Sequence, residues 1–429
     1  MAYVAPASAV VGHIAVPGDK SISHRAVLIG SIADGETRVA GFGRSADTEA
    51  TIAAVRALGA EVVEEDVDTL RITGAGLRGL RAPDEPIDCG NSGTLIRLLA
   101  GILAGQPGRF ELTGDESLRR RPVERVAAPL RRMGALAESR DGRPPLVVEG
   151  GSLCGIRYEL PVASAQVKSA LLLAGLLAVR GDTTVVERFP SRDHTELLLE
   201  QAGVAMRRAP SSVRVSPARA LSLGEVAIPG DFSSAAPFVL AATLVPGSEL
   251  TVHDVGLNPT RTGFLDVLER MGARLTVFNR RRLGREPVGD LEIRSSSLVA
   301  TSIEGAEVPR LVDELPLFAL AAAYARGESA VRGAAELRWK ETDRIESVTD
   351  ALRALGVRIS KSDDGFRVRG VPTRPKGGSV HAAGDHRIAM LGAVAGIASR
   401  DGVELEGAEA VAISFPGFFE LLDRVAQRG

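Results

Sequence analysis

The sequence predicts an α/β (α+β) protein of two domains, because the chain carries an internal duplication and a shorter repeat within each half. Residues 17–21, Pro-Gly-Asp-Lys-Ser, return as residues 229–233, Pro-Gly-Asp-Phe-Ser, 212 positions later in a chain of 429 residues. The first copy carries Lys20 and Arg25 where the second has Phe232 and Pro237. The duplication therefore predicts two similar halves, of which the first bears additional charge.

The shorter repeat divides each half into three units. In each unit an Ala- or Leu-rich helical segment, a turn containing glycine and a short β-rich run follow one another, as at residues 169–178, 235–244 and 317–325, and the last unit runs from residue 386 to residue 428. Six units of roughly 70 residues indicate a repeat architecture and disfavour a TIM barrel, which needs eight βα units. Glycine, which suits a left-handed helix C-cap, ends five of the predicted helices: Gly59, Gly134, Gly203, Gly272 and Gly356.

Three predicted helices begin with small polar residues that are accompanied by cations. They begin at residues 19–25 (Asp-Lys-Ser-Ile-Ser-His-Arg), 88–94 (Asp-Cys-Gly-Asn-Ser-Gly-Thr) and 164–168 (Ser-Ala-Gln-Val-Lys), and Arg97 follows the second one turn later. The N-terminus of a helix is a ready anion site, because its backbone N–H groups and dipole attract negative charge. For any one of these helix starts alone, ordinary N-capping by Ser, Asn or Asp is the alternative. Three such starts in homologous units favour an anion site.

The cations of the chain are unevenly distributed between lysine and arginine. Of 52 basic residues only five are lysines: Lys20, Lys168, Lys340, Lys361 and Lys376. A retained lysine indicates a position where a compact or titratable ammonium matters, with chance retention as the alternative. Arginines recur in motif-like segments, at Arg121, Arg192, Arg344 and Arg387. Solvated surface arginines are the alternative, but together they indicate substrates with several phosphate or carboxylate groups.

The overall composition excludes several classes of protein. A net charge of −2 gives no attraction to nucleic acid or anionic membranes, and no apolar run is long enough to span a bilayer. We expect a cytoplasmic location, because residues 1–12 lack a basic n-region, and reduced thiols at Cys89 and Cys154, although one disulfide is the alternative. A P-loop, a Gly-x-Gly-x-x-Gly fingerprint and a metal-binding spacing are all missing, so we expect chemistry without a cofactor.

In combination, the motifs resemble those of the EPSP synthase (3-phosphoshikimate 1-carboxyvinyltransferase) family of enolpyruvyl transferases. The resemblance runs from about residue 17 to residue 419 and rests on residues 18–25, 90–94, 121–122, 164–168, 340–344 and 385–387. It implies an inside-out α/β barrel fold of two domains, each made of three βαβαββ repeats. It further implies that residues 1–18 and 230–429 form one domain, residues 19–229 the other, and that the active site lies in the cleft between them.

The resemblance also implies the reaction and the residues that carry it. The enolpyruvyl group of phosphoenolpyruvate is transferred to the 5-hydroxyl of shikimate 3-phosphate by addition and elimination, in the pathway to chorismate and the aromatic amino acids. Lys20, Asp313 and Glu341 are implied as catalytic residues. The implied substrate-binding residues are Lys20, Ser21, Arg25, Gly93, Arg121, Ser164, Ala165, Gln166, Arg192, Asp313, Lys340, Arg344 and Arg387. We expect a monomer that acts on these two small molecules. The resemblance implies a glyphosate target, while the motifs leave the glyphosate sensitivity of this chain open.

Several alternatives stay open at this point. Asp313 could only cap a helix, and Glu341 could only pair with Arg344. Ile413 stands where some family members have a lysine that contacts phosphoenolpyruvate. A UDP-N-acetylglucosamine 1-carboxyvinyltransferase is the rival enzyme, although that family places a reactive cysteine in the loop that is residues 114–121 here, where this chain has none. A non-catalytic anion-binding repeat protein is the rival of another class.

Overall fold

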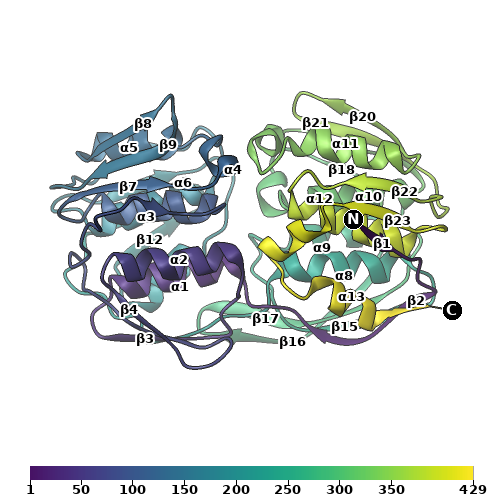
Figure 1. Ribbon diagram of the computed structural model, residues 1–429, viewed down its shortest axis with the longest axis horizontal. Helices are drawn as coiled ribbons and strands as arrows, with labels where there is room; N and C mark the ends of the chain where they lie inside the picture. The colour runs from purple at the N-terminus through teal and green to yellow at the C-terminus, as the bar shows by residue number, and fades with distance from the viewer. Residues whose placement is uncertain (429) are drawn as a thin grey trace. The chain divides into compact units, whose positions relative to one another are not determined.

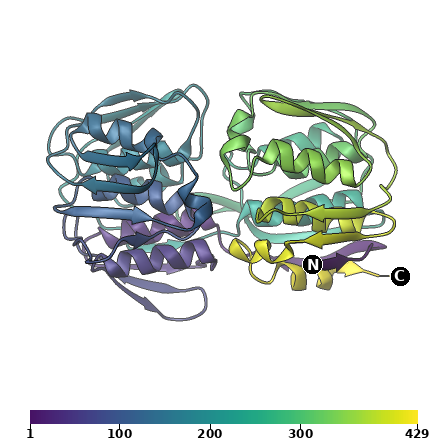
Figure 2. The ribbon, with the colours of Figure 1, turned by 45° about the horizontal axis from the view of Figure 1, so that its top comes forward.

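The computed structural model describes residues 1–428, which divide into two compact units. Unit 1 comprises Met1–Pro17, Pro229–Arg282 and Pro287–Gly429, and unit 2 comprises Gly18–Ile228 and Leu283–Glu286. Each unit contains three sheets, and its helices lie among them, as Figures 1 and 2 both show. The mixed α/β fold class predicted from the sequence is thereby confirmed.

One βαβαββ pattern recurs in the sheets of both units. The second strand pairs parallel with the first and antiparallel with the fourth, and the third strand pairs only with the fourth. In unit 2 the pattern is formed by β6 (Ile87–Asp88), α3 (Gly93–Leu103), β7 (Arg109–Thr113), α4 (Glu116–Arg119), α5 (Glu124–Met133), β8 (Leu136–Arg140) and β9 (Arg143–Glu149), and again by β10 (Arg157–Glu159), α6 (Ala165–Leu176), β11 (Thr183–Val186), α7 (His194–Gln201), β12 (Met206–Ala209) and β13 (Ser212–Val215). In unit 1 it is formed by β18 (Ser302–Ile303), η1 (Val308–Arg310), α10 (Leu315–Tyr324), β19 (Gly327–Val331), η2 (Ala335–Trp339), α11 (Arg344–Ala354), β20 (Arg358–Ser362) and β21 (Gly365–Gly370).

The two repeats that carry the duplicated Pro-Gly-Asp segments exchange their first strands. β2 (Ala9–Ala15) precedes the first copy but pairs parallel with β15 in unit 1, and β14 (Glu225–Ala227) precedes the second copy but pairs parallel with β3 in unit 2. The duplicated segments therefore mark two of the points where the chain passes from one unit to the other. The other elements of these repeats are α1 (Lys20–Ser31), β3 (Glu36–Ala40), α2 (Ala46–Ala57), β4 (Glu61–Glu64) and β5 (Leu70–Thr73), and α8 (Phe232–Leu244), β15 (Glu249–Gly256), α9 (Gly263–Arg270), β16 (Arg274–Leu283) and β17 (Glu286–Arg294).

The last repeat is shorter and is completed by the N-terminal strand. Here β1 (Ala2–Val4) pairs antiparallel with β23, where the other repeats use a C-terminal hairpin. Its elements are β22 (Gly378–His381), α12 (His386–Ala398), β23 (Val403–Glu406), η3 (Ala408–Ile413), α13 (Phe418–Val425) and β24 (Ala426–Gln427).

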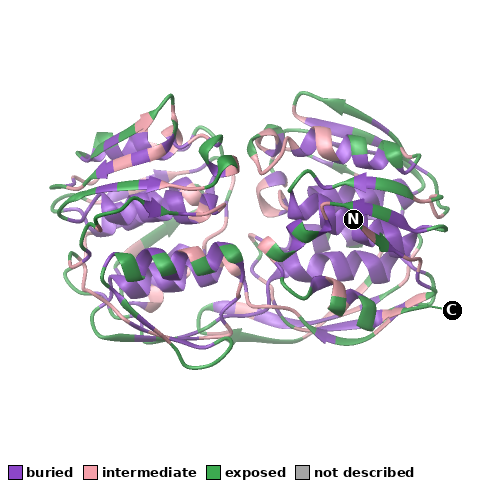
Figure 3. Ribbon diagram, viewed as in Figure 1, coloured by how far each residue is buried: buried purple, intermediate pink, exposed green. Residues whose placement is uncertain are grey.

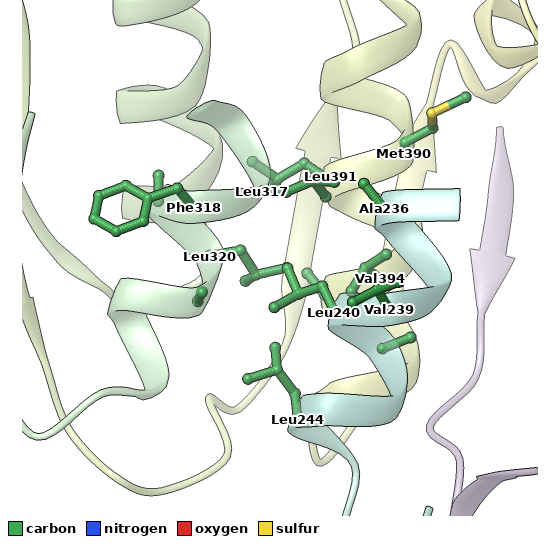
Figure 4. Packing of buried hydrophobic residues seen from close by; sticks show 14 of the residues in the cluster. Ala236, Val239, Leu240, Leu244, Leu317, Phe318, Leu320, Met390, Leu391 and Val394 are labelled. Atoms are coloured by element: carbon green, nitrogen blue, oxygen red, sulfur yellow. The ribbon is translucent and has the colours of Figure 1, made fainter. Parts of the chain in front are cut away.

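The most deeply buried helices, α1, α3 and α6 in unit 2 and α8, α10 and α12 in unit 1, form the core of each unit. Every residue of α8, α10 and α12 is buried, as expected for helices that are apolar on all faces. Their leucine, valine and phenylalanine side chains interlock in the core of unit 1 (Figure 4). In unit 2, α3 packs on α6 so closely that a Cβ at Gly101 would lie 2.2 Å from the backbone oxygen of Ala170. This burial pattern (Figure 3) corresponds to the expected inside-out arrangement.

The hairpin of β16 and β17 has a tip that belongs to unit 2, which counting repeats in the sequence does not reveal. Its strands belong mainly to unit 1, whereas residues 283–286 at its tip belong to unit 2. There Glu286 Oε1 lies 2.6 Å from Nδ1 of His194, and both side chains are buried. Over residues 1–428, no helix combines the length and apolar character that crossing a membrane would require.

Candidate functional site

The first helix of unit 2 presents Lys20 beside an acidic partner. Asp19 caps α1 by accepting a hydrogen bond from the backbone N–H of Ile22 at 2.9 Å. Nζ of Lys20 then lies 2.8 Å from Oδ2 of Asp47 in α2, with 20% of the lysine and 11% of the aspartate side chain exposed. Sequence reasoning missed Asp47, because an acidic residue in the first turn of a helix is common and gives no distinct signal.

Arg25 and Arg192 gather around the same helix start. The Arg25 guanidinium is buried, and it donates to Oγ1 of Thr195 at 2.8 Å and to the backbone oxygen of Ser21 at 2.8 Å. Nη1 of Arg192 lies 3.4 Å from Oγ of Ser21. The structure thus brings three predicted residues, Ser21, Arg25 and Arg192, into one polar group of unit 2.

The starts of α3 and α6 form a second polar group in unit 2. Arg97 donates to the backbone oxygen of Gly93 and to Oε1 of Gln166, both at 2.9 Å. Gln166 in turn donates to Oγ1 of Thr94 at 3.0 Å. Ser164 caps α6 through the backbone N–H of Val167, so the N-capping alternative holds for this residue, and the half-buried Ala165 follows it.

Gly93 leaves room for two guanidinium groups. A Cβ at this position would lie 2.6 Å from Nη1 of Arg97 and 3.3 Å from Nη1 of Arg121. Arg121 is held by Oδ1 of Asn91 at 2.6 Å and Oγ of Ser117 at 3.1 Å. Any larger residue at position 93 would therefore displace at least one of these cations.

In unit 1 the predicted residues converge on Arg344. Its guanidinium, with 2% of the side chain exposed, lies 2.8 Å from Asp385, 2.6 Å from Glu341 and 3.3 Å from Asp313. Burial opposes the charge, but these carboxylates raise the pKa of Arg344 above its ordinary value. The pairing of Glu341 with Arg344, expected as a structural alternative, is present. Asp385 was not predicted as a site residue, although it lies in a motif that was.

Asp313 precedes the N-cap residue of α10. The N-cap of α10 is Glu314, and the Asp313 carboxylate instead lies 3.7 Å from Nζ of Lys340 and 3.7 Å from Nη1 of Arg261. With Arg344, three cations therefore surround this carboxylate, so helix capping cannot be its only role. Arg261 was missed by sequence reasoning, since nothing around it resembles the other arginine segments.

Arg387 begins the last long helix and contacts the second copy of the duplicated segment. Its backbone N–H is capped by Asp385 at 2.8 Å, and its Nη1 donates to the backbone oxygen of Ser233 at 3.1 Å. The Ser233 hydroxyl is hydrogen-bonded to Glu314 and accepts from Arg261 at 2.8 Å. These contacts build the polar group of unit 1 around the starts of α8, α10, α11 and α12.

Ile413 and the two cysteines lie apart from these contacts. Ile413 is the half-buried last residue of η3. Cys89 and Cys154 are free, and burial raises the pKa of the Cys89 thiol far above its ordinary value. Within the described part of the chain, no cluster of three or more His, Cys, Asp or Glu side chains is suited to hold a metal ion.

Comparison with known proteins identifies the family. The family model of EPSP synthase (3-phosphoshikimate 1-carboxyvinyltransferase) matches residues 4–422. The chain is 51% identical to the 3-phosphoshikimate 1-carboxyvinyltransferase of Desulforudis audaxviator over 98% of both chains, and 50% identical to that of Geobacter sulfurreducens over 99% of this chain and 98% of the relative. The EPSP synthase structure from Acinetobacter baumannii superposes with a TM-score of 0.87 at 41% identity, covering 99% of this chain and 97% of that one. The enolpyruvyl transferase NikO from Streptomyces tendae, at 19% identity over 98% of this chain and 96% of that one and a TM-score of 0.79, shares the fold. This chain belongs to the EPSP synthase (3-phosphoshikimate 1-carboxyvinyltransferase) family.

Proposed function

We propose that this chain transfers the enolpyruvyl group of phosphoenolpyruvate to the 5-hydroxyl of shikimate 3-phosphate, with release of phosphate. The observation that carries this conclusion is the full-length identity of about half to enzymes named for that reaction. The product is the one that the pathway to chorismate and the aromatic amino acids requires. The reaction needs acid–base groups and anion-binding cations, and the side chains described above include both.

Both substrates carry a phosphate and a carboxylate, so each requires several cations or N–H donors. We assign shikimate 3-phosphate to the polar groups around the starts of α1 and α6, together with Lys340 of unit 1. Phosphoenolpyruvate is assigned to Lys20, Arg121, Arg344 and Arg387. These residues come from both units, and we propose that they act on the same pair of substrates. The residues that hold shikimate 3-phosphate are then Ser21, Arg25, Ser164, Ala165, Gln166, Arg192 and Lys340.

The chemistry consists of an addition followed by an elimination. The substrate hydroxyl loses its proton and its oxygen bonds to C2 of phosphoenolpyruvate, while C3 gains a proton and becomes a methyl group. In the second step the C2–O bond to phosphate breaks and C3 returns a proton, which restores the double bond. Lys20, Asp313 and Glu341 are proposed to move these protons, because each presents a titratable atom among the anion-binding cations.

Asp47 supports this role for Lys20. A carboxylate 2.8 Å from the ammonium holds the lysine side chain in one direction. Lys20 can then neutralise the phosphoenolpyruvate anion and return a proton to a leaving oxygen. Arg344 donates a 2.6 Å hydrogen bond to Glu341 and so holds the orientation of that carboxylate.

We further propose that glyphosate competes for the phosphoenolpyruvate groups, since it carries a phosphonate and a carboxylate. Arg121, one of the residues assigned to phosphoenolpyruvate, lies so close to Gly93 that a Cβ there would be 3.3 Å from its Nη1. We also propose a cytoplasmic monomer. The rival reaction on UDP-N-acetylglucosamine is disfavoured, because residues 114–121 contain no cysteine and the full-length relatives are named for the reaction on shikimate 3-phosphate.

Phosphorus NMR of the reaction mixture tests the proposed function. With phosphoenolpyruvate and shikimate 3-phosphate together, the phosphoenolpyruvate signal should disappear while inorganic phosphate and one new phosphate monoester grow at equal rates. Either substrate alone should leave the spectrum unchanged. A spectrum that stays unchanged with both substrates would contradict the proposal and favour a binding protein without activity.

A further inference from the structure

We propose that Lys168 is a positioning residue for shikimate 3-phosphate, because its buried side chain fixes the segment that carries Arg192. The inference rests on the proposed function, which assigns Arg192 to that substrate. Lys168 belongs to a sequence motif at the start of α6, yet the mechanism gives it no part in the chemistry. Only 2% of its side chain is exposed, so it cannot itself reach a dissolved substrate.

The Lys168 ammonium contacts three points of one segment. Nζ lies 2.9 Å from Oε1 of Glu187, 3.1 Å from the backbone oxygen of Ser191 and 2.8 Å from Oε1 of Glu196. Glu187 follows β11, and Glu196 lies in the first turn of α7. One side chain of α6 therefore holds residues 187–196 near their beginning, middle and end.

Further hydrogen bonds stiffen the same segment. The other carboxylate oxygen of Glu187 accepts from the Ser191 hydroxyl at 2.6 Å and from the Ser191 backbone N–H at 3.2 Å. His194 is anchored separately by its 2.6 Å contact with Glu286 at the tip of the β16–β17 hairpin. Residues 191 and 194 are thus both fixed, and Arg192 lies between them.

The fixed segment supplies two contacts to the predicted binding group. Nη1 of Arg192 lies 3.4 Å from Oγ of Ser21. Thr195 accepts from Nε of Arg25 at 2.8 Å and lies 2.6 Å from the hydroxyl of Ser169. A shift of residues 187–196 would therefore move Arg192 directly and release Arg25 from one of its partners.

The buried ion pairs of Lys168 are weak evidence for a role in stability, because apolar residues of similar volume can often replace such pairs without loss. The three contacts of its ammonium with residues 187–196 instead favour a role in positioning. The two carboxylates raise the pKa of Lys168 although burial opposes it, and burial raises the pKa of Glu196. A compact ammonium can meet three convergent oxygens, whereas the planar guanidinium of arginine cannot take the same position.

The test combines two variants with a matched control. Lys168→Arg keeps the charge but loses the geometry. A second variant serves in case the first folds poorly. It combines Lys168→Met with Glu196→Gln, which removes the cation together with the charge of one of its two carboxylate partners. Lys361→Arg is the control, because Lys361 is an exposed lysine of unit 1 whose ammonium pairs with Glu346. Circular dichroism and thermal melting identify the folded variants.

In folded variants we expect the KM for shikimate 3-phosphate to rise about tenfold or more, while kcat and the KM for phosphoenolpyruvate change less than about threefold. Calorimetric titration with shikimate 3-phosphate should show the same loss of affinity, and the control should match the wild type. An unchanged KM for shikimate 3-phosphate, or an equal rise of both KM values with a fall in kcat, would overturn this inference alone. A wild-type protein that neither turns over nor binds shikimate 3-phosphate would overturn the proposed function as well.

Discussion

The starts of α1 and α8 carry the same Pro-Gly-Asp-x-Ser segment, but their environments differ. In α1 the residue after the capping aspartate is Lys20, which stays partly exposed beside Asp47. In α8 the same place holds Phe232, which is 1% exposed, and all thirteen residues of that helix are buried. The hydroxyl that the copies share contacts Arg192 in α1 and is enclosed by Arg261 and Glu314 in α8.

The difference shows where each unit carries its charged groups. Unit 2 has Lys20 and Arg25 on the duplicated helix itself, whereas in unit 1 α8 is a core element and charged groups lie at the starts of α10, α11 and α12. Helix N-termini recur in both units, because each repeat begins a helix after its first strand, and a helix N-terminus favours nearby negative charge. The two units therefore share a scaffold but carry their charged residues at different repeats.

The largest effect is expected for Lys20→Arg. Arginine keeps the charge, but it holds its proton too tightly for transfer, and its planar group does not fit the 2.8 Å contact with Asp47. We expect kcat to fall by about 10⁴, the upper end for the loss of acid–base assistance. The matched change in the other copy, Phe232→Leu, should lower the free energy of unfolding by about 1 kcal/mol or more and leave kcat within about twofold. Steady-state kinetics and urea unfolding of both variants test these expectations. If the Lys20→Arg enzyme keeps most of the wild-type turnover, Lys20 contributes only its positive charge.

Glu341→Gln should have the next largest effect. The amide can still accept a hydrogen bond from Arg344 but cannot exchange a proton, so kcat should fall by about 10² to 10³. Binding of shikimate 3-phosphate, measured by calorimetry, should change by less than about threefold. If kcat stays constant and only the KM for phosphoenolpyruvate rises, then Glu341 serves only to position Arg344.

Gly93→Ala tests the second polar group of unit 2. The added methyl group would meet Arg97 at 2.6 Å and Arg121 at 3.3 Å, and these flexible cations would have to move. We expect the KM for phosphoenolpyruvate to rise about tenfold, which corresponds to about 1.4 kcal/mol, with a smaller change in kcat. Gly151→Ala is the control, because a Cβ there meets open space. Equal kinetics for the two variants would contradict the assignment of Arg121 to phosphoenolpyruvate.

His24→Asn should have the smallest effect, on stability alone. Burial, together with Lys20 and Arg25, keeps the pKa of His24 well below its ordinary value, so the folded protein holds it neutral. Below about pH 6.5 the unfolded chain binds a proton that the folded chain does not, and stability is lost as the pH falls, by up to about 1.4 kcal/mol per pH unit. The counterpart in α8 is Ala236, which does not titrate. Urea unfolding between pH 7.5 and 5.5 should show this loss in the wild type and a weaker one in the variant, and parallel curves would contradict it.

Much of the fold could be predicted from the sequence, because repeats and helix-ending glycines are local signals. All five predicted C-cap glycines have positive φ angles: Gly59, Gly134, Gly203, Gly272 and Gly356. The strand exchange and the hairpin tip at residues 283–286 depend on long-range pairing, which a local pattern does not contain. In the site, the lysine and arginine segments could be recognised from local sequence patterns. Asp47 and Arg261 could not, because their partners are distant in sequence and come close only in the folded chain. For Asp313 the sequence left helix capping open, because its cationic neighbours are likewise distant in sequence.

The choice of acceptor tests the central claim most directly. Phosphate release from phosphoenolpyruvate is measured with shikimate 3-phosphate, with UDP-N-acetylglucosamine and with no acceptor, on the wild type, Lys20→Arg and Phe232→Leu. We predict release only with shikimate 3-phosphate, at similar rates for the wild type and Phe232→Leu and at a rate lower by orders of magnitude for Lys20→Arg. Release with UDP-N-acetylglucosamine, or an equal loss in the two variants, would contradict the view that the first copy of the duplicated segment carries the chemistry and the second only the core.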